Sequence, residues 1–173
     1  MPIIRGFVVL VLFIIGATLI LSLSNCSFKS KKVGEYYCSD LIGEIYGKES
    51  LEYRGDDFHN YPFEKQYAIF ICGNQYIHPP TIYMSELFAI YVAKLFAKEG
   101  NRIVAFLKMK LLEANDDLTI RDLILVFSEM SRLKTYDVAS DDELMRLMFE
   151  RVEGMKSIGW KEITLRMLAE IQK

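Results

Sequence analysis

The sequence predicts an all-α protein with an apolar membrane or signal segment at its N-terminus. After Lys32, apolar residues recur at spacings of three and four through most of the chain, which is the period of an amphipathic helix. Strand-like alternation is scarce, and Gly, Pro, Asn and Asp gather in short clusters between the helical segments. These observations favour helices that are joined by short turns.

The apolar run Gly6–Leu23 contains no charged residue. As a helix it would be about 27 Å long, close to the thickness of the hydrocarbon core of a bilayer. We interpret residues 1–25 as a signal or anchor segment and residues 26–32 as a polar tether. An uncleaved anchor, a lipoprotein signal and an ordinary cleaved signal peptide are the three alternatives.

The residues after this run favour the lipoprotein signal. Leu23-Ser24-Asn25-Cys26 resembles a bacterial lipobox, with Asn25 where a smaller residue is usual, and the resemblance implies lipidation of Cys26. Three lysines between residues 29 and 32 disfavour an uncleaved span with an external domain, because positive charge is retained in the cytoplasm. A cytoplasmic domain is the alternative if the span is not cleaved. We expect a bacterial cell-envelope protein, membrane-anchored, whose domain faces the periplasm or the exterior.

The cysteine count bears on the same choice. Lipidation of Cys26 would leave Cys38 and Cys72 as the only other cysteines, and an even remainder suits an oxidising compartment. A disulfide between them would close a loop of about 35 residues. The alternative is that each is a small buried apolar side chain.

Residues 33–173 are predicted to form one helical domain. The first helix is expected over Val33–Tyr46, and Ser50–Tyr61 is expected to be a loop because it is rich in Gly, Asp and Asn and precedes Pro62. Six further helices are predicted, at Phe63–Tyr76, Thr81–Lys98, Asn101–Ala114, Leu118–Leu133, Leu144–Met155 and Ile158–Gln172.

Local signals mark the ends of these helices. Gly100 is expected to end one of them in a left-handed turn, and the carboxylates of Asp116 and Asp117 are expected to cap the helix that follows. Ser140-Asp141-Asp142-Glu143 has the pattern of a capping box. These signals place breaks between the helices independently of their apolar patterns.

The last six helices form three pairs of similar sequence pattern. Glu86-Leu87, Asp122-Leu123 and Glu162-Ile163 are equivalent in the second helix of each pair, at intervals of 36 and 40 residues. Such periods are typical of helical-hairpin repeats. Residues 63–173 therefore resemble a HEAT-like array of about three α-hairpins, which implies a binding surface along the array. An irregular helical bundle is the alternative.

Charge and motifs exclude several functions. All 23 acidic residues but only 17 of the 21 basic residues follow Lys32, so no basic stripe is expected and nucleic acid is not an expected partner. Neither His59 nor His78 has a second metal ligand at helical spacing, so we expect no metal and no cofactor. Nucleophile elbows and glycine-rich phosphate loops are absent. The protein is not expected to be an enzyme.

The loop before Pro62 is the candidate recognition element. It interleaves aromatic and charged residues, and Tyr and Arg are the side chains that most often anchor protein interfaces. The predicted partner-binding residues are Tyr53, Arg54, Asp56, Asp57, Phe58, His59 and Tyr61. The alternative is that these rings fill a groove between the first helix and the array.

These features favour a non-catalytic, envelope-tethered domain that binds another protein. An immunity-type or inhibitor protein would neutralise a toxin or a hydrolase by placing the loop in its cleft. An adaptor or assembly lipoprotein of an envelope complex would instead bind along the array. A small envelope hydrolase that uses Asp56, Asp57 and His59 as a general-base set is the least favoured alternative.

Overall fold

The computed structural model describes residues 31–45, 55–76 and 82–173. These residues form seven α-helices, one 3-10 helix, one π-helix and one short β-hairpin, which confirms the all-α prediction. Within the described ranges, no helix has the length and apolar character needed to cross a bilayer. The predicted segment Gly6–Leu23 and the predicted lipidation site Cys26 lie outside these ranges.

The last five predicted helices agree with the structure to within two residues at each end. In chain order the elements are β1 (Lys32–Val33), β2 (Tyr36–Tyr37), α2 (Cys38–Ile45), the 3-10 helix η1 (Gly55–Asn60), α3 (Phe63–Ile71), the π-helix η2 (Cys72–Tyr76), α4 (Ile82–Lys98), α5 (Asn101–Glu113), α6 (Asp117–Leu133), α7 (Asp142–Glu153) and α8 (Ile158–Ile171).

The first predicted helix is wrong in its first five residues. There β1 and β2 pair antiparallel, with Val33 opposite Tyr36. The turn between them uses Gly34 at a φ of 58°, a left-handed conformation that glycine adopts without steric cost. The chain therefore reverses direction before α2 begins at Cys38.

The predicted helix Phe63–Tyr76 also changes character, because its last five residues form the π-helix η2. A Cβ atom on Gly73 would lie only 2.2 Å from the ring of Phe88, so η2 packs on α4 at a distance that only glycine allows. Single-turn π-helices interrupt α-helices where packing or function demands it. The apolar pattern of residues 63–76 does not distinguish the two helix types.

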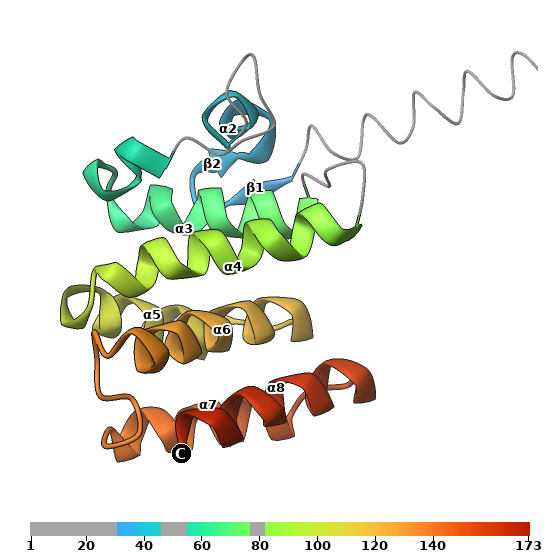
Figure 1. Ribbon diagram of the computed structural model, residues 1–173. Coiled ribbons are helices and arrows are strands. Elements are labelled where there is room, and N and C mark those ends of the chain that lie inside the picture. Colours follow the sequence, from blue (N-terminus) through green and yellow to red (C-terminus); the bar gives the residue numbers. More distant parts are fainter. Residues whose placement is uncertain (1–30, 46–54, 77–81) are drawn as a thin grey trace, which may run out of the picture.

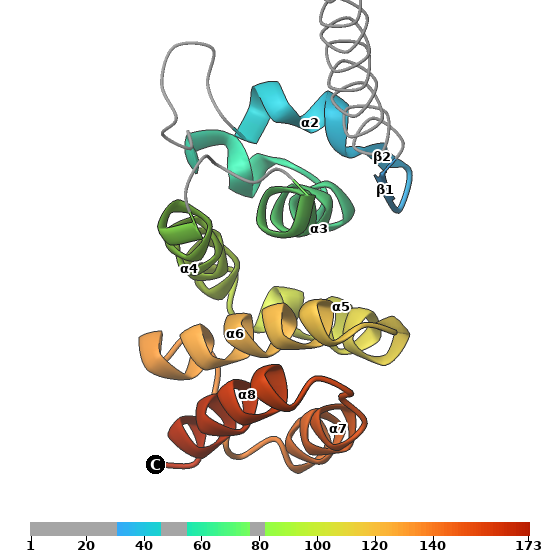
Figure 2. The same ribbon diagram turned by 90° about the vertical axis from the view of Figure 1, so that its right-hand side faces the viewer.

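Helices α3 to α8 are stacked in two layers (Figures 1 and 2). One layer contains α4, α6 and α8, which all begin at the right-hand end of Figure 1, and the other contains α3, α5 and α7. The helix α6 is central, because it packs extensively against both α4 and α8 and also contacts α5 and α7. It consequently buries most of its surface and exposes only a narrow strip.

The core lies between the two layers and continues under α2. Its largest fully buried side chains come from η1 and from α3 to α6: Phe58, Phe70, Phe96, Phe127, Ile69, Ile103, Leu107, Leu111, Leu123, Ile124 and Met130. Burial of each such side chain stabilises the fold by about 1.5–3 kcal/mol. One continuous apolar cluster therefore connects the N-terminal elements to the helical layers.

The connections between helices are fixed by carboxylate caps. The side chain of Asp116 accepts a hydrogen bond from the backbone N–H of Thr119 at 2.8 Å, which confirms Asp116 as a cap of α6. The same prediction is wrong for Asp117, whose carboxylate instead accepts from the backbone N–H of Ser157 just before α8. The predicted capping box at Ser140 is wrong by one residue, because Asp141 caps α7 by accepting from the backbone N–H of Leu144 at 3.0 Å. Both caps satisfy N–H groups that a helix start leaves without a partner.

Asp141 also joins α5 to α7. It accepts hydrogen bonds from the hydroxyl of Tyr136 at 2.5 Å and from the ammonium of Lys108 at 3.1 Å. Burial by itself raises the pKa of Asp141, but the bonds from Tyr136, Lys108 and the Leu144 N–H outweigh it and hold the pKa below its usual value. The ionised carboxylate is thus the form that the folded protein prefers.

We expect this junction to be sensitive to acid. Because the pKa of Asp141 is lower in the folded state, its contribution to stability is present above the pKa of the unfolded chain and is lost as pH falls through the folded value. Denaturation from about pH 7 to about pH 2 should show a shallower loss of stability in Asp141→Asn than in the wild type. Asp142→Asn, at the exposed neighbouring position, is the matched control and should follow the wild-type profile.

Candidate protein-binding surface

The predicted recognition loop is only partly within the described residues. Tyr53 and Arg54 lie outside them, and only the backbone of Asp56 is described. The remainder of the loop forms η1, which packs against α4. The structure therefore places four of the seven predicted contact side chains.

Two of these four side chains are used within the fold. Phe58 is completely buried, and its ring packs edge-on against Phe96 with centroids 5.0 Å apart. The Nδ1 atom of His59 contacts the carboxylate of Glu99, whose side chain is only 4% exposed and which also pairs with Arg102 at 3.2 Å. Phe58 and His59 therefore hold η1 on the end of α4.

The other two side chains differ in their exposure. Asp57 is exposed, whereas Tyr61 is half-buried and its ring lies under the ammonium of Lys65, 4.1 Å from the ring centroid. The carboxylate of Asp57 and the imidazole of His59 share no hydrogen bond or ion pair within the described residues. The general-base set proposed from the sequence therefore gains no geometric support from the side chains that are described.

A disulfide bond joins Cys38 at the start of α2 to Cys72 at the start of η2, with their Cα atoms 5.3 Å apart. Both residues are fully buried. This bond ties α2 and the β-hairpin to the helical layers. Cys38 and Cys72 are the two cysteines that lipidation of Cys26 would leave to form a disulfide.

A buried polar cluster, which sequence reasoning missed, connects η2 to α6 and α8. The amide of Gln75 donates to Thr119 and to Asp122, each at 3.1 Å. Asp122 is fully buried and forms an ion pair with Arg121, whose guanidinium lies 4.6 Å from the ring centroid of Trp160. Burial raises the pKa of Asp122 in spite of the opposing effects of Arg121 and Gln75. Nothing in the local sequence distinguishes this aspartate from an exposed one.

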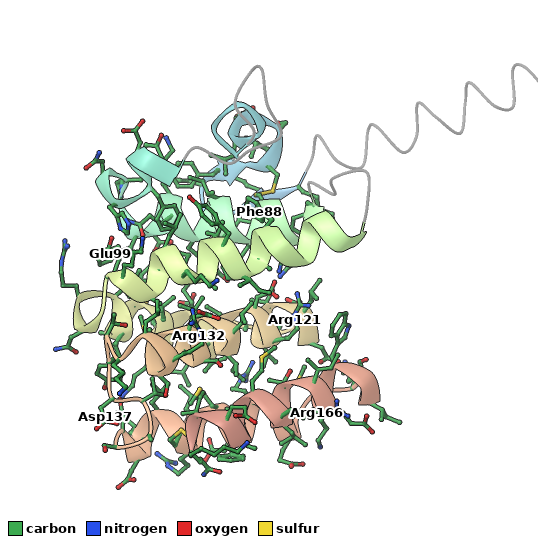
Figure 3. The ribbon with its side chains drawn as sticks, viewed as in Figure 1. Phe88, Glu99, Arg121, Arg132, Asp137 and Arg166 are labelled. Carbon is green, nitrogen blue, oxygen red and sulfur yellow. A yellow bond between two sulfur atoms is a disulfide. The ribbon has the colours of Figure 1, made fainter. Side chains whose placement is uncertain are left out.

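The accessible side of the layer formed by α4, α6 and α8 is here named the second-helix face. It consists of the solvent-accessible residues along one side of α4, α6 and α8: Ile90, Tyr91, Lys94, Lys98, Leu118, Arg121, Leu125, Ser128, Arg132, Ile163, Arg166, Met167 and Glu170. On α6 these residues recur every three or four positions, which is one strip of a helix. Figure 3 shows Arg121, Arg132 and Arg166 on this layer.

This face is basic although the domain is acidic. Its described side chains include five cations and one anion, Glu170, and that anion is paired with Lys173. Arg121 and Arg132 are paired with carboxylates of their own helix, but Lys94, Lys98 and Arg166 form no ion pair with any described residue. Three helices that are distant in sequence therefore contribute cations to one surface.

Exposed apolar side chains lie among these cations. Ile90, Tyr91 and Ile163 are 36%, 44% and 40% exposed. Near the C-terminal ends of α6 and α8 the surface is hollowed by a shallow depression of about 420 Å³, lined by Ser128, Ser131, Arg132, Lys134, Glu170 and Ile171. Protein-binding surfaces typically combine apolar and aromatic residues with surrounding charged groups.

The described residues contain no group of His, Cys, Asp and Glu side chains that is arranged to hold a metal ion. The chain matches no protein-family model, and no curated protein and no solved structure is significantly similar to it. The surface therefore has to be interpreted from its own chemistry.

Proposed function

We propose that this protein is a non-catalytic, envelope-tethered domain that binds another protein through the second-helix face. The observation that supports this proposal is the concentration of cations and exposed apolar side chains on one face of an acidic domain. Charge complementarity selects partners and accelerates their encounter. The partner surface that fits this face is acidic with apolar contacts.

We also propose that α3 to α8 form a short HEAT-like array. The support is their arrangement as three successive pairs whose first and second helices occupy separate layers (Figure 2). Equivalent positions of the pairs differ as expected for stacked repeats, since Asp122 is buried in α6 and Glu162 is exposed in the last helix, α8. A terminal repeat needs such a polar outer surface.

Within this proposal we favour an adaptor or assembly role over a plug that inhibits a toxin or hydrolase. A plugging loop must offer its side chains to the partner, whereas Phe58 is buried and His59 is paired with Glu99. The second-helix face, by contrast, extends over three helices. An immunity-type inhibitor remains the second candidate because Asp57 on η1 is exposed.

For the location we propose that the chain is held at the bacterial envelope by Gly6–Leu23 or by a lipid on Cys26, with the domain in an oxidising compartment. The disulfide between Cys38 and Cys72 supports this location, because such bonds persist outside the cytosol. In cells lysed directly into denaturant, which removes the protection by burial, Cys38 and Cys72 should resist alkylation until a reductant is added. Alkylation without reductant would contradict export.

The binding proposal predicts position-specific crosslinking in cells. A photo-reactive phenylalanine analogue in place of Lys98, Arg132 or Arg166 should crosslink the full-length protein to one protein partner. The same analogue at Arg146, on the exposed side of α7, should not. Crosslinking from Asn60 on η1 alone would favour the inhibitor mode, and crosslinking from none of these positions would contradict protein binding.

Charge reversal on this face should weaken the complex. We expect Lys94→Glu together with Lys98→Glu to raise the dissociation constant for the crosslinked partner by about tenfold or more, since both cations lack an intramolecular ion pair with described residues. Arg146→Glu is the control, because Arg146 is an exposed cation that lies outside the second-helix face. Equal effects of the two changes would contradict the assignment of the face.

A further inference from the structure

The two most exposed large apolar side chains of the described chain lie at one end of the domain. Ile158 is 76% exposed and Leu112 is 61% exposed, whereas the other large apolar side chains are at most 46% exposed. Leu112 lies near the end of α5 and Ile158 is the first residue of α8. The connections beside them are in contact, because Asp117 accepts from the backbone N–H groups of Lys156 at 3.0 Å and Ser157 at 2.6 Å.

The residues around Ile158 have the composition of a membrane-interface contact. Trp160, the single tryptophan of the chain, is half-buried two residues later. A Cβ atom on Gly159 would meet nothing within 4 Å, so this turn projects into open space. The side chain of Lys156 is exposed, and its ammonium forms no ion pair with any described residue. Tryptophan and lysine are favoured at lipid headgroups, with aliphatic side chains below them.

The described chain begins at this same end. The ammonium of Lys31 lies 5.3 Å from the ring centroid of Tyr76, and the adjacent Gln75 hydrogen-bonds to Thr119 in the first turn of α6. Arg121, one half-turn further along α6, is stacked on Trp160. A row of contacts therefore connects Lys31 to Trp160 across the end at which α4, α6 and α8 begin (Figure 1).

The distance along the chain from the apolar run to Lys31 is short. Seven residues, 24–30, separate Leu23 from Lys31, so the two residues can lie at most about 29 Å apart. A lipid on Cys26 would shorten this reach further. If the chain is anchored as proposed, this end of the domain is held beside the bilayer surface, whereas η1 lies at the opposite end of α4 (Figure 1).

We propose that Leu112, Lys156, Ile158 and Trp160 form a membrane-docking tip that lies on the phospholipid headgroups of the bilayer to which the chain is tethered. This inference rests on the proposed tethering and adds a second lipid contact and an orientation. With the tip on the bilayer, α4, α6 and α8 extend away from it. The second-helix face then stands open to a partner at the side of the domain.

The single tryptophan makes the tip directly measurable. The full-length protein is reconstituted into vesicles of phosphatidylethanolamine and phosphatidylglycerol, with and without lipids that are brominated near the headgroup end of the acyl chains. We expect the brominated lipids to quench the fluorescence of Trp160. We also expect the emission maximum of Trp160 to lie at a shorter wavelength than in the denatured protein. Leu112→Glu with Ile158→Glu should reduce the quenching by about twofold or more, because both changes place charge at the interface.

Met109→Glu with Leu133→Glu is the matched control. These residues are 41% and 36% exposed, they are also apolar, and they lie outside both the tip and the second-helix face. Quenching that is retained in the control and lost in the tip variant supports the proposal. If the protein floats with the vesicles but Trp160 is not quenched, the docking tip alone is overturned. The docking tip is also overturned if the tip variant and the control variant lose quenching equally. A protein that does not float with the vesicles would overturn the tethering and the tip together.

Discussion

Loss of the Cys38–Cys72 disulfide is expected to lower the free energy of unfolding by about 4 kcal/mol. The bond closes a loop across a sequence separation of 34 residues, so the reduced unfolded chain gains conformational entropy. Cys38→Ser together with Cys72→Ser should therefore lower the thermal midpoint by about 10 °C, as measured by the loss of helical circular dichroism. The N-terminal elements should open first, because α2 packs only against its neighbours β2, α3 and η2 among the major contacts.

Cys26→Ser is the control for this prediction, since it removes a thiol outside the described fold. Its thermal midpoint should equal that of the wild type. Reductant should destabilise the wild type and leave the double serine variant unchanged. Identical midpoints of the wild type with and without reductant would show that the bond does not stabilise the fold.

Asp122→Ala is expected to destabilise the protein by about 3–5 kcal/mol, because it removes one partner of a buried ion pair. Asp122 is fully buried, and the Arg121 side chain beside it is only 14% exposed. The variant also removes a hydrogen-bond acceptor of Gln75, because the side-chain amide of Gln75 donates to the carboxylate of Asp122 at 3.1 Å. Urea denaturation followed by circular dichroism measures the loss.

The equivalent position of the last helix pair provides the matched control. Glu162 is exposed, so Glu162→Ala should change the free energy of unfolding by no more than about 0.5 kcal/mol. Replacing both charges, with Arg121→Met and Asp122→Leu, should restore much of the lost stability, because no unpaired charge is then buried. A double variant as unstable as Asp122→Ala would indicate that the hydrogen bonds of Asp122, rather than its charge, dominate.

The sequence predicted the helical elements well where the signals are local. The boundaries of α4 to α8 follow from apolar periodicity, from Gly100 and from carboxylate caps such as Asp116. The prediction was poorer where contacts between residues distant in sequence determine the backbone conformation. Gly73 lies in a π-helix because η2 packs against Phe88, and that contact is not encoded in the residues around it.

The candidate site was less predictable than the fold. Composition identified Phe58 and His59 as members of a recognition loop, but the structure uses them to attach η1 to α4. The sequence around an aromatic residue in a polar loop does not show whether its ring contacts a partner or the core. Only the position of Phe96 and Glu99, some 40 residues later, distinguishes the two roles.

The sequence by itself determined the all-α class and the positions of most helices, because periodicity and capping act over a few residues. It also supplied the hypothesis of an apolar anchor, Gly6–Leu23, which lies outside the described structure. The tertiary structure decided which charges share a surface and which are buried. Lys94, Arg132 and Arg166 form one basic face only because α4, α6 and α8 pack side by side, and Asp122 is buried while Glu162 is exposed for the same reason. Burial and charge patterns depend on neighbours that are distant in sequence, so they emerge only when the layers assemble.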